Sequence, residues 1–463
     1  MYISVNGKKV SRIHFTGILG SGMSAIAQFL RWKGLAISGS DRQISKTKSN
    51  PSMNILSAMG CELTPQDGSG IKETTDAICV STAIENSNPD ILAATEKGIP
   101  VFHRSDILAS VVSTHKTIAV AGTSGKSTVT AMIFELLFSC GYSPSLLSGA
   151  ALKRLVHQGL IGNAFKGSSD LLVIEADESD GTLVKYHPWI SLILNVSKDH
   201  KPVDEVLSLF KQLSEQSKNC LINGDDERLK EISATMRFGL NRTNDFYPQE
   251  VQCSALCSKI SLNDHEYTLP LPGNHNASNL MAALSVCSFF DCDPKRLVQA
   301  TETFKGVDRR FAITQTASGV TVIDDFAHNP EKIKAAVSAA RAVSESLFVI
   351  YQPHGFGPTR FLKNDYAEVF RTVLGEKDSL FLLPVYYAGG SAVMDIQSRD
   401  LITLMGPVPF SAKAAEGKEK LLETIKQRIT QSCVLLMGAR DPSLPQFAEQ
   451  IIDALGGKKS DPD

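Results

Sequence analysis

One strand-like segment runs into a glycine turn, a lysine and two hydroxyl residues, and these residue types together suit phosphate chemistry. It reads Lys116-Thr-Ile-Ala-Val-Ala-Gly-Thr-Ser-Gly-Lys-Ser-Thr128. Backbone N–H groups freed at a glycine turn and at a helix start can cradle a polyphosphate. Lys126 would neutralise the outer phosphates, and Ser127 or Thr128 offers a hydroxyl to Mg²⁺. We therefore predict a nucleotide-binding phosphate loop made of Gly122, Thr123, Ser124, Gly125, Lys126, Ser127 and Thr128.

The residues after this loop have the periodicity of a helix. Apolar side chains recur at Val129, Met132, Ile133, Leu136 and Leu137, the spacing of one helix face. The loop is two residues shorter than the usual Walker A pattern, so the strand–turn–helix context identifies it rather than the letters alone. The alternative interpretation is a structural turn with an incidental lysine.

Carboxylates and a histidine end two further apolar strands. The first segment is Asp170-Leu-Leu-Val-Ile-Glu-Ala-Asp-Glu-Ser-Asp180, and the second runs from Trp189 to Asp199-His200. Ligands of open α/β sheets bind at the carboxyl ends of strands, so we expect Glu175, Asp199 and His200 to converge on the loop that carries Lys126, a setting that suits Mg²⁺. Asp177, Ser179 and Asp180 of the first segment are interpreted as helix caps or a solvated turn.

The first 112 residues alternate between predicted strands (12–16, 36–38, 77–81) and predicted helices (24–33, 53–59, 91–97). Gly17-Ile-Leu-Gly-Ser-Gly22 lies between the first strand and helix, and Asp41 closes the second strand. Such a loop, with an acid about 24 residues downstream, suits a diphosphate and a ribose. The spacing is G-x-x-G-x-G rather than the dinucleotide fingerprint, so a purely structural turn remains the alternative.

Composition and charge describe an ordinary globular enzyme. The chain has 463 residues, of which 43% are hydrophobic and 21% charged, and its net charge is −2. We expect no nucleic-acid partner, no membrane partner, no signal peptide and a cytoplasmic location. The nine cysteines are scattered without zinc-type spacing, so we expect neutral thiols in a reducing compartment.

Three α/β domains are predicted along the chain. Their boundaries are 1–112, 113–310 and 311–456, followed by a disordered tail at 457–463. The third contains the strand segment Gly319-Val-Thr-Val-Ile-Asp-Asp-Phe-Ala-His-Asn-Pro330, which again ends in acids. Alternating strands and helices of this kind build mainly parallel sheets.

Several motifs in one order resemble those of the Mur ligases, over nearly the whole chain. They are Gly122-Thr-Ser-Gly-Lys-Ser, Glu175-Ala-Asp-Glu-Ser-Asp, Asn195-x-x-x-Asp-His200, Gly273-Asn-His-Asn-Ala-Ser-Asn279, Arg309-Arg-Phe311 and Asp324-Asp-Phe-Ala-His328. The resemblance implies a Rossmann-like UDP-binding domain, a central P-loop ATP-binding domain and a C-terminal Rossmann-like domain for the amino substrate.

The resemblance also implies an activity. ATP and Mg²⁺ would serve an amide ligase that joins an amino acid, L-alanine foremost, to the lactyl carboxylate of UDP-N-acetylmuramate through an acyl phosphate, giving ADP and phosphate in peptidoglycan synthesis. The protein would be a monomer or homodimer. Two alternatives stay open: a paralogue that ligates a peptide or another amine, and a non-catalytic nucleotide-binding scaffold.

Residue roles follow from the same resemblance. Lys126 would contact the β- and γ-phosphates, Ser127 a first magnesium, and Glu175 and His200 a second, while Arg310 would reach the phosphates. The remaining implied contacts are Asn276 and Asn279 for adenine, Asp325 for the ATP ribose, Gly20, Ser21 and Gly22 for the UDP diphosphate, Asp41 and Ser81 for the uridine or sugar, and His328, His354 and Arg360 for the amino substrate. Simpler interpretations are that Asn276 caps a helix and that Ser81 ends a strand.

The sequence departs from the family pattern mainly in the third domain. The loop His354-Gly-Phe-Gly-Pro-Thr-Arg360 stands where alanine-adding members read roughly His-Arg-Tyr-Thr-Arg-Thr-Arg. Glycine and proline cannot replace the arginine forks that suit a carboxylate. Other departures are Leu19, Lys201-Pro202, Phe326 and Gly390. The ATP-binding half is therefore intact, whereas the amino-substrate half is altered.

Overall fold

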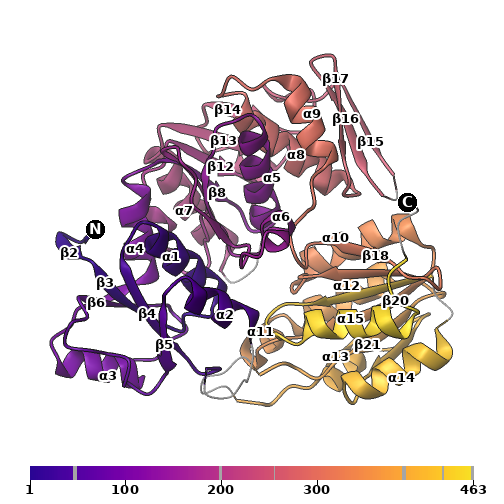
Figure 1. Cartoon of the computed structure of the whole chain (residues 1–463). Helices are drawn as coiled ribbons and strands as arrows, with labels where there is room; N and C mark the ends of the chain where they lie inside the picture. The colour runs from indigo at the N-terminus through magenta and orange to yellow at the C-terminus, as the bar shows by residue number, and fades with distance from the viewer. Residues whose placement is uncertain (45–49, 198–200, 255, 388–392, 430–431, 460–463) are drawn as a thin grey trace. The chain divides into compact units, whose positions relative to one another are not determined.

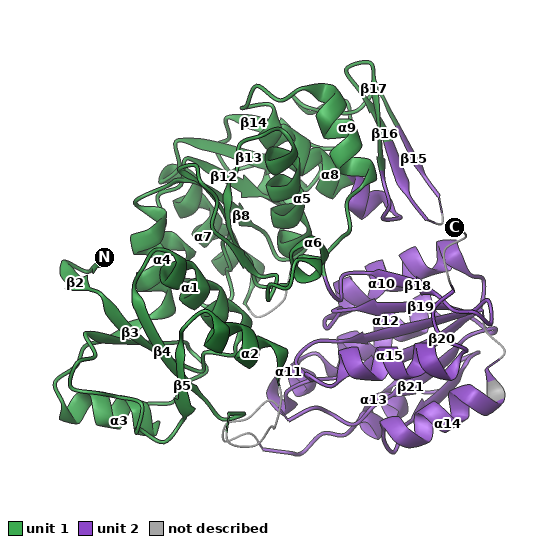
Figure 2. Cartoon of the chain, in the orientation of Figure 1, with its two compact units in different colours: residues 1–250, 260–268, 278–307 green, residues 251–259, 269–277, 308–463 purple. Residues whose placement is uncertain are grey.

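A computed structural model describes residues 1–44, 50–197, 201–254, 256–387, 393–429 and 432–459 (Figure 1). The chain divides into two compact units (Figure 2). Unit 1 comprises residues 1–250, 260–268 and 278–307, and unit 2 comprises residues 251–259, 269–277 and 308–463.

The first 112 residues form a parallel sheet of strand order β5-β4-β3-β6-β7, preceded by the hairpin β1–β2. The strands are β1 (Ile3–Val5), β2 (Lys8–Val10), β3 (Arg12–Thr16), β4 (Ala36–Asp41), β5 (Glu62–Pro65), β6 (Ala77–Val80) and β7 (Val101–His103). The helices are α1 (Ser21–Trp32), α2 (Pro51–Ala58), α3 (Pro89–Glu96) and α4 (Arg104–Val112). The strands and helices predicted here are present, with ends shifted by at most three residues.

A second sheet, of strand order β10-β9-β11-β8-β12-β13-β14, follows in unit 1 and is parallel except at β10. Its strands are β8 (Lys116–Ala121), β9 (Ser145–Leu147), β10 (Ala164–Phe165), β11 (Leu171–Glu175), β12 (Ile190–Ile193), β13 (Asn219–Asn223) and β14 (Met236–Phe238). The helices are α5 (Lys126–Ser139), α6 (Lys153–His157) and α7 (Val203–Glu215), with the short turns η1 (Thr182–Lys185) and η2 (Glu227–Leu229). Because β8 lies between β11 and β12, their three carboxyl ends meet at one edge, as predicted.

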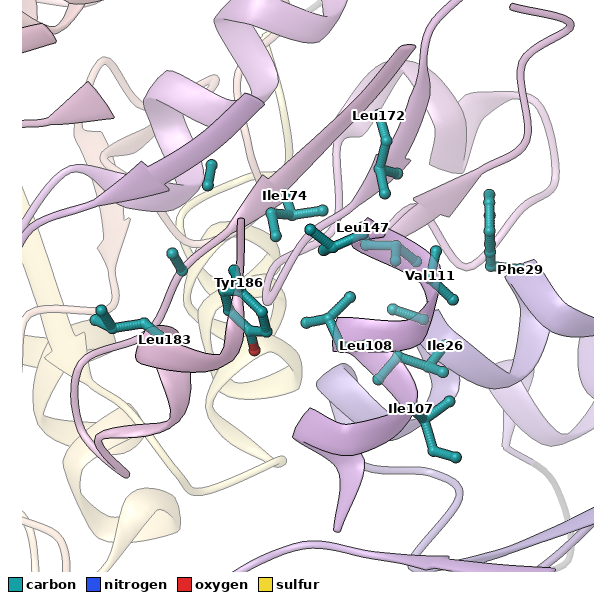
Figure 3. Close-up of a cluster of buried hydrophobic side chains, with 14 of the residues drawn as sticks. Ile26, Phe29, Ile107, Leu108, Val111, Leu147, Leu172, Ile174, Leu183 and Tyr186 are labelled. Atoms are coloured by element: carbon teal, nitrogen blue, oxygen red, sulfur yellow. The ribbon is translucent and has the colours of Figure 1, made fainter. Parts of the chain in front are cut away.

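One apolar core joins these two sheets (Figure 3). Side chains of α1 and α4 pack in the same buried cluster as side chains of β9 and β11. Members labelled in Figure 3 are Ile26, Phe29, Ile107, Leu108, Val111, Leu147, Leu172, Ile174, Leu183 and Tyr186. Burial of apolar surface is the main stabilising term in folding, so the helix that follows the first glycine loop is held against the central sheet.

The third sheet belongs to unit 2 and has the order β18-β19-β23-β20-β21-β22, parallel except at β18. Its strands are β18 (Ala312–Gln315), β19 (Thr321–Asp325), β20 (Leu347–Gln352), β21 (Ser379–Leu382), β22 (Ser411–Ala414) and β23 (Cys433–Gly438). The helices are α10 (Pro330–Val343), α11 (Phe356–Phe361), α12 (Lys363–Val373), α13 (Ser398–Met405), α14 (Lys418–Arg428) and α15 (Leu444–Ala454). Three mainly parallel sheets with helices confirm the predicted α/β class.

The remaining elements are β15 (Glu250–Cys253), β16 (Ser258–Leu262) and β17 (His265–Leu269), which form a small sheet, and the helices α8 (Asn274–Cys287) and α9 (Pro294–Glu302). The three domain boundaries stay predictions. The predicted disordered tail needs correction at its start, because the Lys459 N–H donates to the Gln315 carbonyl and the Gly457 carbonyl accepts from the Ala317 N–H. Residues 460–463 of that tail lie outside the described residues.

All nine cysteines are free thiols, and five of them are buried. Among the described helices, none combines the length and the apolar character that a membrane crossing requires.

Candidate functional site

The predicted phosphate loop connects β8 to α5. Gly122 and Gly125 have φ angles of 137° and 86°, a region that glycine reaches without the steric penalty of a side chain. Gly125 is the N-cap of α5 and has no side chain to satisfy the first-turn N–H groups. An uncapped helix start of this kind binds anions, because its N–H groups and the helix dipole both favour negative charge.

Asn195, just beyond the end of β12, holds the phosphate loop in shape. Its Oδ1 accepts hydrogen bonds from the Thr123 hydroxyl (3.0 Å) and the Ser124 N–H (2.9 Å), and its Nδ2 donates to the Ser124 carbonyl (3.0 Å). Asn195 belongs to one of the sequence motifs, but the motif alone predicts no role for it. Its place at the carboxyl end of a strand beside β8 was the only available signal.

Lys126 lies at the start of α5 with its ammonium group close to three oxygens. Nζ donates to the Gly122 carbonyl (2.7 Å) and to Glu178 Oε2 (2.6 Å), and Asp177 Oδ1 is 3.6 Å away. Burial opposes the charge on Lys126, but Glu178 and Asp177 outweigh it, so the pKa of Lys126 is raised. The sequence predicts no role for Glu178, which the structure shows to be a buried counter-ion of Lys126.

Glu175 ends β11 opposite the phosphate loop. Its Oε1 accepts from the Ser148 hydroxyl (2.6 Å) and the Gly149 N–H (2.8 Å), and its Oε2 accepts from the Ser127 hydroxyl (3.2 Å). The predicted partners Asp199 and His200 lie outside the described residues. Within the described part of the chain, no three His, Cys, Asp or Glu residues gather as a metal site. Ser127 and Glu175 nevertheless offer adjacent oxygens, which fits Mg²⁺ because that ion takes few protein ligands and keeps several waters.

The two asparagines predicted to lie near adenine occupy the first turns of α8. Asn279 belongs to unit 1, and a Cβ placed on Gly125 would come within 2.7 Å of its Oδ1. Asn279 therefore lies directly beside the phosphate loop. The Asn276 side chain, described with unit 2, donates from Nδ2 to the Pro272 carbonyl (2.8 Å) and is buried.

The glycine loop of the first sheet leads into α1. Gly20 and Ser21 are exposed there, and the Asp41 carboxylate accepts from the N–H groups of Leu19 (3.2 Å) and Gln43 (3.0 Å). Asp41 and the glycine loop are thus brought together. The predicted Ser81 directly follows β6.

A cation that the sequence interpretation missed lies beside this loop. A Cβ on Gly22 would come within 2.9 Å of Arg104 Nη1, and Arg104 Nη2 donates to Asp180 Oδ2 (3.0 Å). Arg104 is the first residue of α4, far from the loop in sequence, so only the fold brings it there.

In unit 2, the two predicted nucleotide residues flank the first two strands of the third sheet: Arg310 precedes β18 and Asp325 ends β19. The Asp325 carboxylate accepts from the N–H groups of Phe311 (2.7 Å) and Ala327 (2.7 Å). The Arg310 guanidinium lies over the Phe326 ring, 4.7 Å from its centroid, a cation–π distance. Phe326, where the family commonly has tyrosine, therefore packs against an arginine.

The predicted amino-substrate residues are only partly brought together. The rings of His328 and His354 lie 5.4 Å apart, and the Phe326 carbonyl is 2.9 Å from His328 Nδ1. Arg360 instead forms an exposed ion pair with Asp395 and donates to the Val393 carbonyl. Gly390 lies outside the described residues.

Three family models match the chain in order. The Mur ligase family catalytic domain matches residues 12–116, the Mur ligase middle domain matches residues 120–287, and the Mur ligase glutamate ligase domain matches residues 309–440. The UDP-N-acetylmuramate–L-alanine ligase of Syntrophomonas wolfei is 32% identical over 452 residues, covering 93% of this chain and 94% of that relative.

Two solved structures share the fold. The UDP-N-acetylmuramate–alanine ligase of Thermotoga maritima has a TM-score of 0.78 at 23% identity, covering 96% of this chain and 98% of its own. A murein peptide ligase of Psychrobacter arcticus has a TM-score of 0.70 at 17% identity, covering 97% and 100%.

Proposed function

The chain belongs to the Mur ligase family, and on that premise we propose that it is an ATP-dependent amide ligase. It joins L-alanine to the lactyl carboxylate of UDP-N-acetylmuramate in the cytoplasm, as a step of peptidoglycan synthesis. The observation that carries this proposal is the meeting of Lys126, Ser127 and Glu175 at one sheet edge around the phosphate loop. The full-length similarity to the alanine ligase of Syntrophomonas wolfei supports the substrate assignment.

The chemistry explains why such an edge is needed. A carboxylate is a poor electrophile, so one of its oxygens first attacks the γ-phosphorus of ATP and ADP leaves. The amine nitrogen then attacks the acyl carbon, the bond to phosphate breaks, and the amine loses a proton to solvent. The first step crowds anions together, and positive charge placed in advance stabilises it. Lys126 would provide that charge: burial opposes its protonation, but the neighbouring carboxylates raise its pKa and keep the ammonium group charged.

Ser127 and Glu175 would hold Mg²⁺ through their side-chain oxygens. The resemblance to the family implies that His200 would be a further ligand of the metal. When bound, the ion neutralises charge on the phosphate and the carboxylate oxygens. Glu175 has both oxygens hydrogen-bonded, so its position is fixed before any ligand arrives.

The other predicted residues complete the proposal. Residues 1–112 take the sugar nucleotide: Gly20, Ser21 and Gly22 with α1 bind its diphosphate, Asp41 and Ser81 lie by its uridine or sugar, and Arg104 adds a positive charge. Residues 113–310 take ATP, with Asn276 and Asn279 near adenine and Arg310 near the phosphates, while Asp325 of the third domain takes the ribose. Residues 311–456 take the amine through His328 and His354.

One observation favours a second acceptor, a peptide or another amine. The loop 354–360 lacks two family arginines, and its remaining Arg360 is bound to Asp395. A free amino acid would thus meet fewer cations than in alanine-adding relatives. A non-catalytic scaffold is less well supported, because Lys126, Ser127 and Glu175, the residue types that phosphoryl transfer needs, are all retained beside the phosphate loop.

Phosphate release tests the proposal directly. The full-length protein is incubated with ATP, Mg²⁺, UDP-N-acetylmuramate and, in separate reactions, L-alanine, glycine, L-serine and a murein tripeptide. We expect release that requires both the sugar nucleotide and L-alanine. Release only with the tripeptide would identify the second acceptor class, and no release with any amine would contradict the ligase proposal.

A further inference from the structure

A buried asparagine connects the central sheet to the glycine loop of the first sheet. Asn163 directly precedes β10, and its Nδ2 donates to the Ser21 carbonyl (2.7 Å) and to the Ser24 hydroxyl (2.9 Å). Its Oδ1 accepts from Gln28 Nε2 (2.9 Å). All three partners belong to α1, which begins at Ser21 immediately after the glycine loop. One side chain therefore holds the first two turns of α1.

The same residue connects to the predicted metal site through its backbone. The Asn163 carbonyl accepts from the Ser148 N–H (2.9 Å). The Ser148 hydroxyl donates to Glu175 Oε1 (2.6 Å), and the Ser127 hydroxyl donates to Glu175 Oε2 (3.2 Å). A continuous path of hydrogen bonds thus runs from α1 to the phosphate loop, and every residue on it belongs to unit 1.

Burial makes this path stiff. The exposed fraction of Asn163 is 2%, and Ser24, Gln28 and Ser148 are buried as well. Leaving any one of these buried polar groups without its partner is unfavourable, because the group has also lost its hydrogen bonds to water. The backbone just before Asn163 is also closely packed. Gly162 has a φ of 97°, and a Cβ at that position would come within 2.7 Å of Val156 Cγ2. Asn163 has little freedom to move.

We propose that Asn163 is a positioning residue of the ligase reaction. It fixes the start of α1, which carries the sugar-nucleotide loop, at a set place relative to Glu175 and the phosphate loop, so that the lactyl carboxylate meets the γ-phosphate in line. This inference rests on the proposed function. Reactions that depend on the alignment of two bound substrates lose about 100-fold in rate when one is misplaced by about 1 Å.

The experiment compares the wild type with Asn163→Ala in the full-length protein. We expect the kcat for phosphate release with L-alanine to fall at least tenfold, while the KM for ATP stays within about twofold, because the phosphate loop keeps its own contacts to Asn195. Unfolding temperature is measured for both proteins, since the variant loses buried hydrogen bonds.

A matched control separates positioning from stability. Asn244 is also buried in unit 1, and its Nδ2 also makes two hydrogen bonds, to Asp225 Oδ1 (2.7 Å) and the Asn241 carbonyl (2.9 Å). Asn244→Ala therefore loses similar contacts away from both loops, and we expect it to lower the unfolding temperature and leave kcat unchanged.

Each outcome supports or overturns the positioning role. A kcat for Asn163→Ala within twofold of the Asn244→Ala value overturns it. If Asn163→Ala does not fold, Ser24→Ala is tested instead, because it removes the hydrogen bond between Asn163 Nδ2 and the Ser24 hydroxyl and places alanine in a helix, where it is well tolerated. An unchanged kcat in Ser24→Ala would also overturn the positioning role of Asn163. Absence of turnover by the wild type overturns the ligase proposal itself, whereas wild-type turnover with an unaffected variant overturns only the role of Asn163.

Discussion

At the residue scale, the ion pair between Lys126 and Glu178 has a clear consequence for nucleotide binding. The Lys126 ammonium already donates to Glu178 and to the Gly122 carbonyl, so incoming phosphates compete with a carboxylate for the same cation. Both side chains are mostly buried, and an ion pair taken out of water gains little net stability. Exchange of one anionic partner for another is therefore feasible.

Replacing Lys126 separates its role in turnover from its role in stability. Lys126→Ala should lower phosphate release at least about 100-fold, the usual effect of removing one preorganised donor to developing charge. It also leaves Glu178 buried without its partner, which costs roughly 3–5 kcal/mol. The double variant Lys126→Ala/Glu178→Gln should regain stability in thermal unfolding without regaining turnover. Wild-type-like turnover in either protein would refute the phosphate-loop assignment.

Asn195 offers a second test at the same scale. Asn195→Ala removes three hydrogen bonds that shape residues 123–124, each of which contributes about 1 kcal/mol. We expect the Kd for ATP, measured by calorimetry, to rise at least tenfold. The control is Asn219→Ala at the first residue of β13, away from the carboxyl ends of the strands, where Nδ2 donates to the Trp189 carbonyl. An equal effect of both changes would argue against the role of Asn195.

At the element scale, α5 carries a buried acid that the phosphate site does not use. Burial raises the pKa of Glu135 to about 7, against the opposing effect of Arg154 and Lys305. Its Oε1 has no hydrogen-bond partner among the described residues. The acid sits in the middle of the helix whose first turn would bind phosphate, so its protonation state affects the stability of the element that forms the site.

The sign of the pH effect follows from proton counting. Between about pH 4.3 and pH 7 the unfolded chain has lost this proton while the folded chain keeps it, so the free energy of unfolding falls as pH rises, by roughly 4 kcal/mol in all. Glu135→Gln should match the wild type near pH 4 and exceed it in stability at pH 8, by urea unfolding. The exposed Glu302 provides the control Glu302→Gln. The same pH dependence in Glu135→Gln and the wild type would contradict this assignment.

The elements themselves were largely predictable from sequence, whereas their contacts were not. The strands β8, β11 and β19 were predictable because each is an apolar run that ends in glycine or an acid. Such residues are expected at the carboxyl ends of parallel strands, where ligands bind. Asn163, Glu178 and Arg104 escaped notice because their partners lie about 52 to 142 residues away, and local periodicity carries no information on such pairs. The hairpin β1–β2 was missed because each strand has three residues, too few to show a period.

At the scale of the whole molecule, the first two sheets form one compact unit with a shared core. Ion pairs add to it: Arg104 binds Asp180, and Lys185 binds Asp106. The regions that match the first two family models therefore lie largely in one compact unit. Substrate loops on separate sheets keep a fixed spacing when the apolar core between them is continuous.

This continuity predicts how the molecule unfolds. Leu172 lies on β11 with no exposed surface, in the cluster that also contains Ile26 and Phe29 of α1. Leu172→Ala should cost about 2–5 kcal/mol, and because the core is shared, hydrogen exchange should accelerate in α1 as much as in β11. The control is Leu435→Ala on β23 of unit 2, equally buried, which should leave α1 protected. Faster exchange confined to β11 and its neighbouring strands would show that the two sheets open independently.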